Sequence, residues 1–568
     1  MLVTIRNSYF LNTLKISYSS RRALKRILYS LTGSRRWTID RAQTGYFIEL
    51  AETLARIKVK SSTEVVLWGV TLANHRQSLI YLVLGAALMM RGIRVRIVIC
   101  DKVLDGCNKV TSGKTPNPDK WKEKCRTCYP PVNNLFQLAG FEIILLSELV
   151  DTQKATKLRK YVSTISLQDV KNLEYEGISL GRLVYASVSK YFNKVDFESE
   201  PNKDEIVRRY LYSGLLLLNA TDEYINQYKP DRLIVTQGDY ITWGIAVEKA
   251  INRRVEVLRF QSVTFFELHE DLYFFEYAKL DHEGKLKFDW SMPGELWEER
   301  KLKPLAENQE RRLSAQMARR SRCNIYKESE RRPKEIHTVG FFCQCEIDIN
   351  EGFLRKAGFR GTIPWLLESI EAMVENSEIR WLIRVHPDEY SQYGDQLTMA
   401  AVKKAFPKLP DNIEMVSPVE PFSDFILRID AGVLFAGTAG LELPLMGKVA
   451  VIASTPHYSR HGFTVDAKNK EDYFVLLRTM STLTPLRDEQ IELARKYAYA
   501  YFVQRAIPFH VMDKSTQYNG GIRLKPNFIE SMMPGNDPVL DYLCDGVTSN
   551  SQPGFWLHDK LISETSLR

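Results

Sequence analysis

Two apolar strands, each ending in a polar or glycine-bearing turn, constrain the fold of this chain most. Residues 381–385 (WLIRV) form an apolar strand that ends at His386-Pro387. A second strand, 432–436, is followed by Gly437-Thr438-Ala439-Gly440 and by a helix that begins near Leu441. Free backbone N–H groups and the dipole of that helix would point to the same place, which favours an anion there. The pattern therefore predicts a phosphate-bearing ligand at the carboxyl edge of a parallel sheet.

The succession of strand-like and helix-like segments indicates an α/β fold in two parts. The first part opens with a strand at 64–69 and a helix at 78–91, and the second restarts with a strand at 338–342 and a helix at 363–374. Strands that alternate with helices are typical of doubly wound parallel sheets. A chain of 568 residues is also too long for one hydrophobic core. We therefore predict two Rossmann-like domains; a single large doubly wound domain with insertions is the alternative.

The expected division of the chain has four parts. Residues 1–60 form a basic N-terminal arm. Residues 61–330 form the first Rossmann-like domain, with a cysteine-bearing insertion at 101–134 and a strongly charged linker at its end. Residues 331–486 form the second Rossmann-like domain, and residues 487–568 form a long helix and a tail.

The excess positive charge of the chain is confined to the arm. The formal net charge is +9, and residues 1–60 contain 12 lysines and arginines against 3 acidic residues, so the remainder is balanced. Within residues 20–36, Leu24, Leu28 and Leu31 would share one face of a helix. Such a basic helix can lie on an anionic membrane surface or pack its apolar face on its own protein. The arm lacks a recognisable nucleic-acid-binding module, so we expect no nucleic-acid partner.

The sequence predicts neither secretion nor a membrane span. The first 30 residues lack the continuous apolar core of a secretory signal. The longest apolar run, Leu79–Met90, has the length of a buried core helix and is too short to cross a membrane. We therefore expect a cytoplasmic protein that is either free or peripheral on the inner face of the cell membrane.

Four of the eight cysteines are grouped in and near the insertion of the first domain. Cys125 and Cys128 form a C-x-x-C pair, and Cys100 and Cys107 lie upstream across a loop-like segment. Four thiolates can hold a structural zinc ion. The spacing of the first pair is irregular, and reduced free thiols are the alternative in a cytoplasmic protein.

Four motifs in the second half of the chain resemble those of one enzyme family. They are RVHP at 384–387, GTAGLE at 437–442, Gly447-Lys448 and HYSRHGF at 457–463. Together they resemble the capsule polysaccharide biosynthesis glycosyltransferases, which include the β-Kdo transferases and have the two-domain GT-B architecture. The resemblance is specific over residues 340–466 and loose in the first half of the chain.

The resemblance implies a glycosyltransferase that moves a sugar, for example Kdo from a CMP-linked donor, to a growing surface polysaccharide or glycolipid. The first domain would bind the acceptor and the second the nucleotide sugar. His386 would contact the donor phosphate, Thr438 and the backbone of 437–440 would cradle it, and Glu442 would accept hydrogen bonds from ribose hydroxyls. Enzymes of this architecture usually work without a bound metal, so no catalytic cofactor is expected.

Glycosyl transfer needs groups that stabilise the departing phosphate, and His386 is the first candidate. Arg384, Thr438 and Lys448 are further candidates, because basic side chains and helix N-termini supply preorganised positive charge. Arg384 could equally face the other side of its strand, and a solvated Lys448 after a helix is the more common arrangement. The ring of Tyr458 could stack on a base or pack in the core.

The acceptor hydroxyl needs a base, and Asp239 in the segment Gln237-Gly238-Asp239 is the candidate. It follows a strand at 232–236, so it would lie at the carboxyl edge of the first sheet. The alternative is that Asp239 caps the helix that starts near Ile241.

Other functions are compatible with the same architecture. A nucleotide-sugar epimerase or a polyol-phosphate transferase could have it, and a non-catalytic member of a polysaccharide-assembly complex could keep the fold and bind only a partner. An epimerase would act on a soluble nucleotide sugar and would have no use for a basic membrane arm, which favours the glycosyltransferase.

Overall fold

The computed structural model describes residues 41–71, 75–110, 117–192, 197–262, 272–280, 286–288, 292–321, 335–344, 358–359, 361–386, 389, 397–417, 420–513, 523–549 and 554–565. The chain divides into two compact units: unit 1 comprises Met1–Asp289 and Ile507–Arg568, and unit 2 comprises Trp290–Ala506. Each unit is built on one mainly parallel sheet, so the prediction of two Rossmann-like domains is confirmed. The basic helix expected within residues 20–36 lies outside the described residues.

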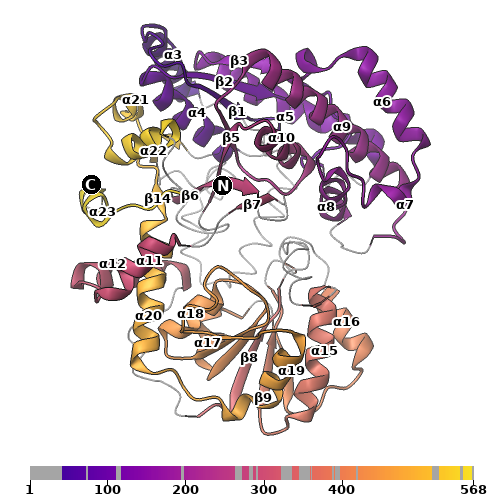
Figure 1. Cartoon of the computed structure of the whole chain (residues 1–568), viewed down its shortest axis with the longest axis vertical. Helices are drawn as coiled ribbons and strands as arrows, with labels where there is room; N and C mark the ends of the chain where they lie inside the picture. Colours follow the sequence, from indigo (N-terminus) through magenta and orange to yellow (C-terminus); the bar gives the residue numbers. More distant parts are fainter. Residues whose placement is uncertain are drawn as a thin grey trace, which may run out of the picture. The chain divides into compact units, whose positions relative to one another are not determined.

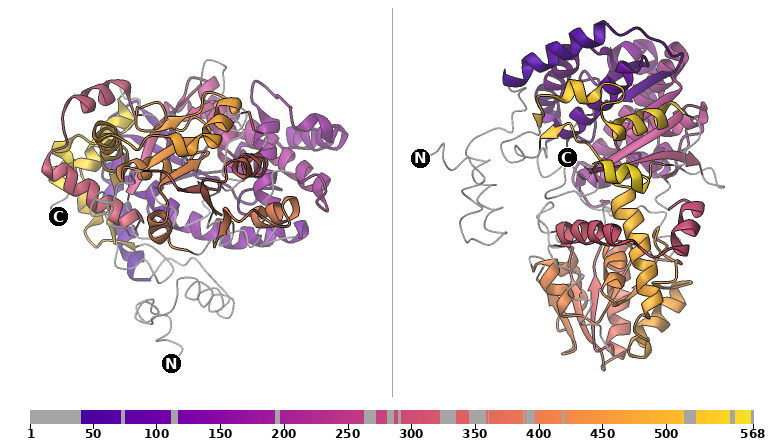
Figure 2. Two further views of the ribbon diagram at one scale, coloured as in Figure 1. Left: turned by 90° about the horizontal axis from the view of Figure 1, so that it is seen from below. Right: turned by 90° about the vertical axis from the view of Figure 1, so that its left-hand side faces the viewer.

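The unit boundaries differ from the expected ones at two places. α11 (Gly294–Leu302) and α12 (Glu307–Ser321) fall in the expected linker but pack against α20 (Asp488–Tyr499) of unit 2, as Figure 2 shows. After α20 the chain returns to unit 1, where β14 (Ile507–Pro508) pairs with β6 (Leu272–Leu280). Helix packing and a sheet edge therefore set both boundaries, and composition alone does not reveal either.

Unit 1 contains an eight-stranded sheet whose first five strands are parallel. Their order is β3-β2-β1-β4-β5, and β6, β7 and β14 extend the β5 edge in antiparallel pairing. Such an order reverses between the first and fourth strands, as in doubly wound folds. The strands are β1 (Glu64–Trp68), β2 (Arg94–Ile99), β3 (Glu142–Leu145), β4 (Arg232–Val235), β5 (Glu256–Ser262) and β7 (Leu286–Phe288).

The helices of unit 1 connect these strands and surround the sheet (Figure 1). The apolar run predicted to form a core helix lies in α4, where Leu79–Leu88 are buried. No helix in the described ranges combines the length and the hydrophobicity that a membrane span requires. The helices are α3 (Arg41–Ala55), α4 (His75–Met90), α5 (Trp121–Leu138), α6 (Thr152–Thr164), α7 (Leu167–Val170), α8 (Leu180–Phe192), α9 (Lys203–Tyr228) and α10 (Ile241–Asn252).

The last segment of the chain folds back onto unit 1. α21 and α22 contact α4 (Figure 1). Arg91, after the end of α4, forms an ion pair with Asp541 of α22. Nε of Arg232 on β4 donates a hydrogen bond to the carbonyl of Val547 at 3.0 Å. The elements of this segment are β15 (Met512–Asp513), β16 (Arg523–Leu524), α21 (Phe528–Met532), α22 (Pro538–Thr548) and α23 (Asp559–Thr565).

Unit 2 contains six parallel strands in the order β10-β9-β8-β11-β12-β13. Numbered along the chain, this is the order 3-2-1-4-5-6 of dinucleotide-binding α/β folds. Ligands of such sheets bind outside the carboxyl ends of the strands at the point where the order reverses, which here lies between β8 and β11. The strands are β8 (Thr338–Phe342), β9 (Arg380–Arg384), β10 (Ile413–Val416), β11 (Ala431–Leu434), β12 (Val449–Ile452) and β13 (Val465–Asp466).

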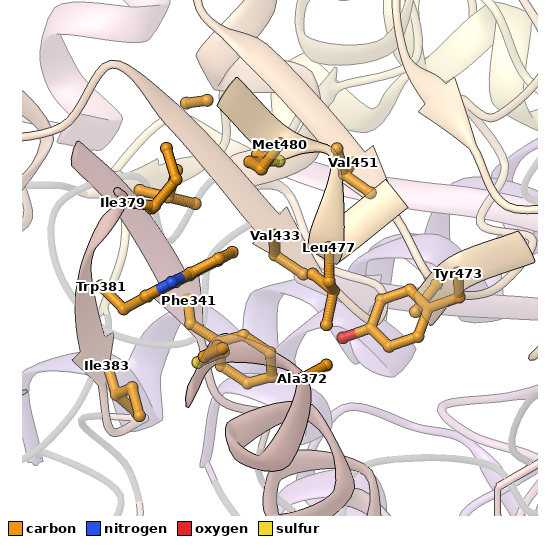
Figure 3. Packing of buried hydrophobic residues seen from close by; sticks show 14 of the residues in the cluster. Phe341, Ala372, Ile379, Trp381, Ile383, Val433, Val451, Tyr473, Leu477 and Met480 are labelled. Atoms are coloured by element: carbon orange, nitrogen blue, oxygen red, sulfur yellow. The ribbon is translucent and has the colours of Figure 1, made fainter. Parts of the chain in front are cut away.

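One face of the unit 2 sheet forms a dense apolar core (Figure 3). Side chains alternate along each strand, so every second residue points to this face. α15 (Thr362–Glu375) and α19 (Lys470–Arg478) cover it, and Tyr473 and Leu477 of α19 are fully buried there. The buried strand residues are Val339, Phe341, Trp381, Ile383, Ala431, Val433, Val449 and Val451.

The opposite face of this sheet approaches shorter helices through residues that lack a side chain. A Cβ atom on Gly340 would lie 2.8 Å from Cδ1 of Ile429, and one on Gly432 would lie 2.5 Å from Cδ1 of Leu443. The helices that pack on this face are α17 (Phe422–Leu427) and α18 (Ala439–Leu445). Close packing here fixes the start of α18 relative to the strand ends.

A similar close approach in unit 1 positions the turn that carries Asp239. A Cβ atom on Gly244 of α10 would lie 2.5 Å from the carbonyl oxygen of Gly238 and 2.5 Å from Cδ2 of Leu183. We expect Gly244→Ala to lower the free energy of unfolding by about 1–3 kcal/mol, because the methyl group displaces backbone. Urea titration measures this.

Gly45→Ala is the matched control for that substitution. Gly45 lies inside α3 of the same unit, and nothing lies within 4 Å of its Cβ position. Alanine should stabilise the helix there by about 0.5–1 kcal/mol. Equal effects of the two substitutions would contradict the close approach at Gly244.

Candidate active site

The parallel register of unit 2 brings four strand ends into one row. The residues paired side by side across β9, β8, β11 and β12 are Arg384, Phe342, Leu434 and Ile452. The positions two residues further along the chain, which we call the carboxyl-edge row, are His386, Gln344, Ala436 and Ser454. Adjacent strands lie about 4.8 Å apart. Two strand spacings separate His386 from Ala436, so we expect their Cα atoms to lie about 10 Å apart along this row.

His386 is partly exposed at the end of β9. The backbone N–H of Glu389 donates to the carbonyl of His386 at 3.1 Å. The buried carboxylate of Glu389 in turn accepts a hydrogen bond from Oγ1 of Thr398 at 2.6 Å. Because Thr398 lies in the first turn of α16 (Leu397–Ala405), these bonds tie the backbone of the histidine to a helix. The structure thus places His386 at the carboxyl end of β9, with its carbonyl bonded to the N–H of Glu389.

Each of the two glycines of the Gly437–Gly440 turn is required for a different reason: Gly437 by its backbone conformation and Gly440 by a close contact. Gly437 has φ +133°, a conformation that L side chains rarely adopt. A Cβ atom on Gly440 would lie 2.3 Å from the hydroxyl of Tyr458. That hydroxyl donates a hydrogen bond to the carbonyl of Gly437 at 2.6 Å. Tyr458 is buried, so it supports the turn from beneath and its ring does not form an exposed stacking surface.

The start of α18 presents backbone N–H groups at the strand end. The N–H of Gly440 donates to the carbonyl of Gly437 at 3.1 Å, and that of Leu441 donates to the carbonyl of Thr438 at 2.9 Å. Among the described residues, the N–H groups of Thr438 and Ala439 have no hydrogen-bond acceptor. Thr438 is also exposed. α18 has only 7 residues, so it has no long helix dipole. Any attraction for an anion here comes mainly from these individual amides.

Two other residues predicted for the site, Lys448 and Glu442, have buried side chains. Nζ of Lys448 is buried and donates to the carbonyls of Ile426 and Ile429 at 2.8 and 2.5 Å. Lys448 precedes β12, so it lies at the amino edge of the sheet, opposite the carboxyl-edge row. Glu442 is 5% exposed, which leaves no open carboxylate for a ribose. We therefore leave both residues out of the site.

Arg384 is turned toward the loop after β10. Its Nη2 donates to the carbonyl of Glu420 at 2.8 Å, and its guanidinium lies 5.2 Å from the ring centre of Phe425. Burial lowers the pKa of Arg384, and the nearby carboxylate of Glu420 partly opposes this. The guanidinium is therefore bonded to Glu420 and packed on Phe425.

Gln344 is the site residue that the sequence patterns did not single out. It is partly exposed and lies two residues beyond β8, between His386 and Ala436 in the carboxyl-edge row. Its Oε1 is 3.5 Å from the position that a Cβ of Gly437 would take. It therefore lies at the point where the strand order reverses. The signal available in the sequence was a polar residue two positions after a buried strand. The pairing of β8 with β9, which sets Gln344 beside His386, was not visible there.

Asp239 lies in unit 1 at the carboxyl end of β4, which borders the reversal point of that sheet. Its side chain is 50% exposed, and Oδ2 lies 4.0 Å from Nη1 of Arg259. Arg259 is itself buried, and its Nε donates to Glu276 at 2.6 Å. The cap position of α10 is occupied by Tyr240, so Asp239 does not cap that helix. An exposed carboxylate beside a fixed guanidinium is compatible with a base.

The four cysteines predicted to bind zinc come from three places in unit 1. Cys100 follows β2, Cys107 lies in the next loop, and Cys125 and Cys128 are on α5. All four are free thiols. Burial, with the neighbouring thiols, raises the pKa of Cys107 and raises that of Cys128 to about 11. Within the described ranges no three His, Cys, Asp or Glu side chains are grouped to hold a metal ion, so zinc stays a prediction.

A hollow of about 390 Å³ lies at the amino ends of β4 and β5 in unit 1, away from Asp239. Lys229 and Arg254 line it, with φ of 49° and 62°, after the ends of α9 and α10. Basic side chains at helix C-termini offset the negative end of the helix dipole. This local role accounts for the charge of the hollow, which lies at the edge opposite to the one where such sheets bind ligands.

Comparison with known proteins gives similarity in structure only. No family profile matches the sequence, and no curated protein sequence matches it. The chain is similar in structure to KpsC of Thermosulfurimonas dismutans, a β-Kdo 2,4 transferase, at 13% identity and TM-score 0.30, over 54% of this chain and 88% of that one. It is similar to UDP-GlcNAc 2-epimerase from Neisseria meningitidis at 10% identity and TM-score 0.25, over 77% of this chain and 95% of that one. It is also similar to the spinosyn rhamnosyltransferase SpnG at 11% identity and TM-score 0.24, over 78% of this chain and 95% of that one. These scores are too low to assign a role to any residue.

The loop after β12 is held against α20 and the residues that follow α20 by His457. The ring of His457 stacks on that of Tyr501 with centres 4.1 Å apart, and its Nδ1 lies 3.1 Å from the hydroxyl of Tyr497. Burial lowers the pKa of His457 well below its ordinary value of 6.5, and Arg505 and His461 lower it further. The folded protein therefore holds this imidazole neutral.

The neutral state of His457 predicts a loss of stability in mild acid. As pH falls below 6.5, the unfolded chain gains a proton on this histidine that the folded chain does not, so the free energy of unfolding decreases. The loss from this group is at most about 1.4 kcal/mol per pH unit. Urea titrations at about pH 7 and about pH 5.5 should show a smaller decrease for His457→Gln than for wild type.

His337→Gln is the control for that measurement, since His337 is exposed at the amino edge of the same sheet. It reports what replacement of an exposed histidine by glutamine does to the same measurement. An unchanged response in His457→Gln would mean that this histidine is not held neutral.

Proposed function

We propose that the protein is a glycosyltransferase that binds a nucleotide sugar at the carboxyl-edge row of unit 2. The observation that carries this proposal is the position of the Gly437–Gly440 turn. It follows β11 at the reversal point of a 3-2-1-4-5-6 sheet, with Gln344 beside it and His386 on the next strand but one. Sheets of this order bind nucleotides at that point. The motif resemblance of residues 384–387 and 437–442 supports the same site.

The chemistry of the row suits a departing phosphate. Transfer of a glycosyl group leaves negative charge on the nucleotide phosphate, and N–H donors fixed before the reaction stabilise it without reorganisation. The N–H groups of Thr438 and Ala439 and the hydroxyl of Thr438 are such donors. His386 and the carboxamide of Gln344 lie along the same edge and can donate further hydrogen bonds. The mechanism we propose uses these groups and no bound metal ion.

Asp239 is the proposed base for the acceptor hydroxyl. Its exposed carboxylate can accept the hydroxyl proton while the oxygen attacks the anomeric carbon of the donor. The buried guanidinium of Arg259, whose Nη1 lies 4.0 Å from Oδ2 of Asp239, is held by Glu276 and can help to position this carboxylate. The acceptor we propose is a growing surface or capsular polysaccharide or a glycolipid, and the donor is a nucleotide sugar of the CMP-Kdo type.

The cellular setting follows as part of the same proposal. An acceptor that is anchored in a membrane would be reached by a cytoplasmic enzyme that is peripheral on the inner face of the cell membrane. The basic residues within 20–36 would then supply the attraction to anionic lipid. A nucleotide-sugar epimerase of the same architecture would need neither the acceptor nor this attraction.

Substitution of His386 tests the donor site. His386→Ala should weaken binding of the nucleotide that the wild type prefers among CMP, UDP and GDP by about ten-fold, because a hydrogen bond to a charged phosphate is lost. Isothermal titration measures this, and thermal unfolding should show a folded protein. His337→Ala, at the opposite edge of the same sheet, should bind as the wild type does.

Two results would contradict the site. Wild-type protein that binds none of the three nucleotides would favour the non-catalytic alternative. Nucleotide binding that His386→Ala leaves intact would remove the histidine from the donor site while leaving the glycine turn in place.

Substitution of Asp239 tests the catalytic role. Asp239→Asn should lower sugar transfer at least about 100-fold, the usual contribution of a general base, with nucleotide affinity unchanged. Mass spectrometry of products from candidate nucleotide sugars and acceptors measures transfer and distinguishes it from epimerisation. Asp169→Asn, an exposed aspartate of α7 in the same unit, is the control and should remain active. An active Asp239→Asn variant would exclude it as the base.

A further inference from the structure

Two side chains from the loop after β12 hold carbonyl groups of the glycine turn from within the protein. Oγ of Ser454 donates to the carbonyl of Phe435 at 2.5 Å. The hydroxyl of Tyr458 donates to the carbonyl of Gly437 at 2.6 Å. Both side chains are buried, at 3% and 1% exposure. Neither hydroxyl therefore contacts a ligand in the carboxyl-edge row directly.

The geometry of the peptide unit converts these two bonds into a direction for two amides. In a trans peptide the C=O of one residue and the N–H of the next point in opposite directions. A carbonyl of Phe435 held by Ser454 directs the N–H of Ala436 away from β12. A carbonyl of Gly437 held by Tyr458 likewise directs the N–H of Thr438 away from the interior. Ala436 is partly exposed and Thr438 is exposed, which is compatible with both amides on the outer side of the turn.

The hydroxyl of Tyr458 is fixed in its role as a donor. Gly440 leaves the space that the phenol occupies, since a Cβ there would lie 2.3 Å from the hydroxyl oxygen. Burial raises the pKa of Tyr458 well above 10, so the hydroxyl keeps its proton. The preceding residue, His457, is stacked on Tyr501 and bonded to Tyr497 of α20. These contacts hold the backbone of Tyr458 against α20 and leave the phenol little freedom to turn away.

We propose that Ser454 and Tyr458 are positioning residues that orient the N–H groups of Ala436 and Thr438 toward the phosphate of the nucleotide donor. The inference rests on the proposed donor site and names the side chains that make its backbone selective for an anion. Without the hydroxyl of Ser454, the peptide unit 435–436 could rotate. Without that of Tyr458, the carbonyl of Gly437 would keep only the longer bond from the N–H of Gly440, at 3.1 Å, and the unit 437–438 would be held less firmly. A rotated unit would present a carbonyl oxygen, which repels a phosphate.

Removal of the phenol hydroxyl tests the inference with little change in shape. Tyr458→Phe should weaken binding of the nucleotide preferred by the wild type among CMP, UDP and GDP by about five- to ten-fold, the loss expected for one well-placed hydrogen bond. Ser454→Ala should weaken it in the same direction. Isothermal titration of the full-length chain measures both. The matching nucleoside has no phosphate, so its affinity for the variants should equal its affinity for the wild type.

Tyr473→Phe is the matched control. Tyr473 is a fully buried tyrosine of the same unit, and its hydroxyl lies 2.7 Å from Oγ of Ser369 in the core on the other face of the sheet. The Tyr473→Phe variant loses one buried hydroxyl hydrogen bond, and this bond is not part of the glycine turn. The control should unfold at a temperature similar to Tyr458→Phe and bind the nucleotide as the wild type does.

The outcomes separate this inference from the proposed function. Nucleotide binding that is unchanged in both Tyr458→Phe and Ser454→Ala would overturn the inference and leave the donor site standing. An equal loss of affinity in Tyr473→Phe, or a loss that also affects the nucleoside, would show a general effect of stability and would overturn it too. A wild-type protein that binds no nucleotide would overturn the proposed function and the inference with it.

Discussion

Parallel pairing of β9, β8, β11 and β12 in one register is the constraint on which the candidate site depends. The strand residues Arg384, Phe342, Leu434 and Ile452 lie side by side. The residues two positions after them therefore lie at the same edge of the sheet. A shift of one residue in any strand would turn its exit residue to the opposite face. The apolar core under the other face, with Trp381 and Phe341 buried against α15, makes such a shift costly.

The sequence predicted the elements of this arrangement well. The strand at 381–385 is observed as Arg380–Arg384, the strand at 432–436 as Ala431–Leu434, and the helix near Leu441 as Ala439–Leu445. Local patterns suffice here, because apolar runs bounded by glycine and proline define buried strands without reference to distant residues. The prediction that Lys448 contributes to the phosphate site was wrong, since a residue before β12 lies at the amino edge of a parallel sheet.

Contacts between distant segments were beyond the sequence patterns. Gln344 and His386 are brought together by strand pairing, and nothing within the segment FFCQC indicates which strand lies beside it. The support of Gly437 by Tyr458 joins residues 21 positions apart through a buried hydroxyl. The return of the chain at Ile507 to the edge strand β6 depends on which edge the earlier part of unit 1 leaves open. Each case is decided by three-dimensional packing that local composition does not encode.

The discontinuous course of unit 1 has a consequence for the order of events on the ribosome. Unit 2 is one uninterrupted stretch, so all of its sheet has been synthesised once residue 506 has emerged. Unit 1 at that moment still lacks β14 and the helices that cover α4, and its β6 edge and part of an apolar helix surface stay open until the last sixty or so residues arrive. All residues of unit 2 are therefore synthesised before unit 1 is complete, a reversal of the usual N-to-C order in which domains are completed. Protection of that open edge during translation is a requirement that this topology imposes on the cell.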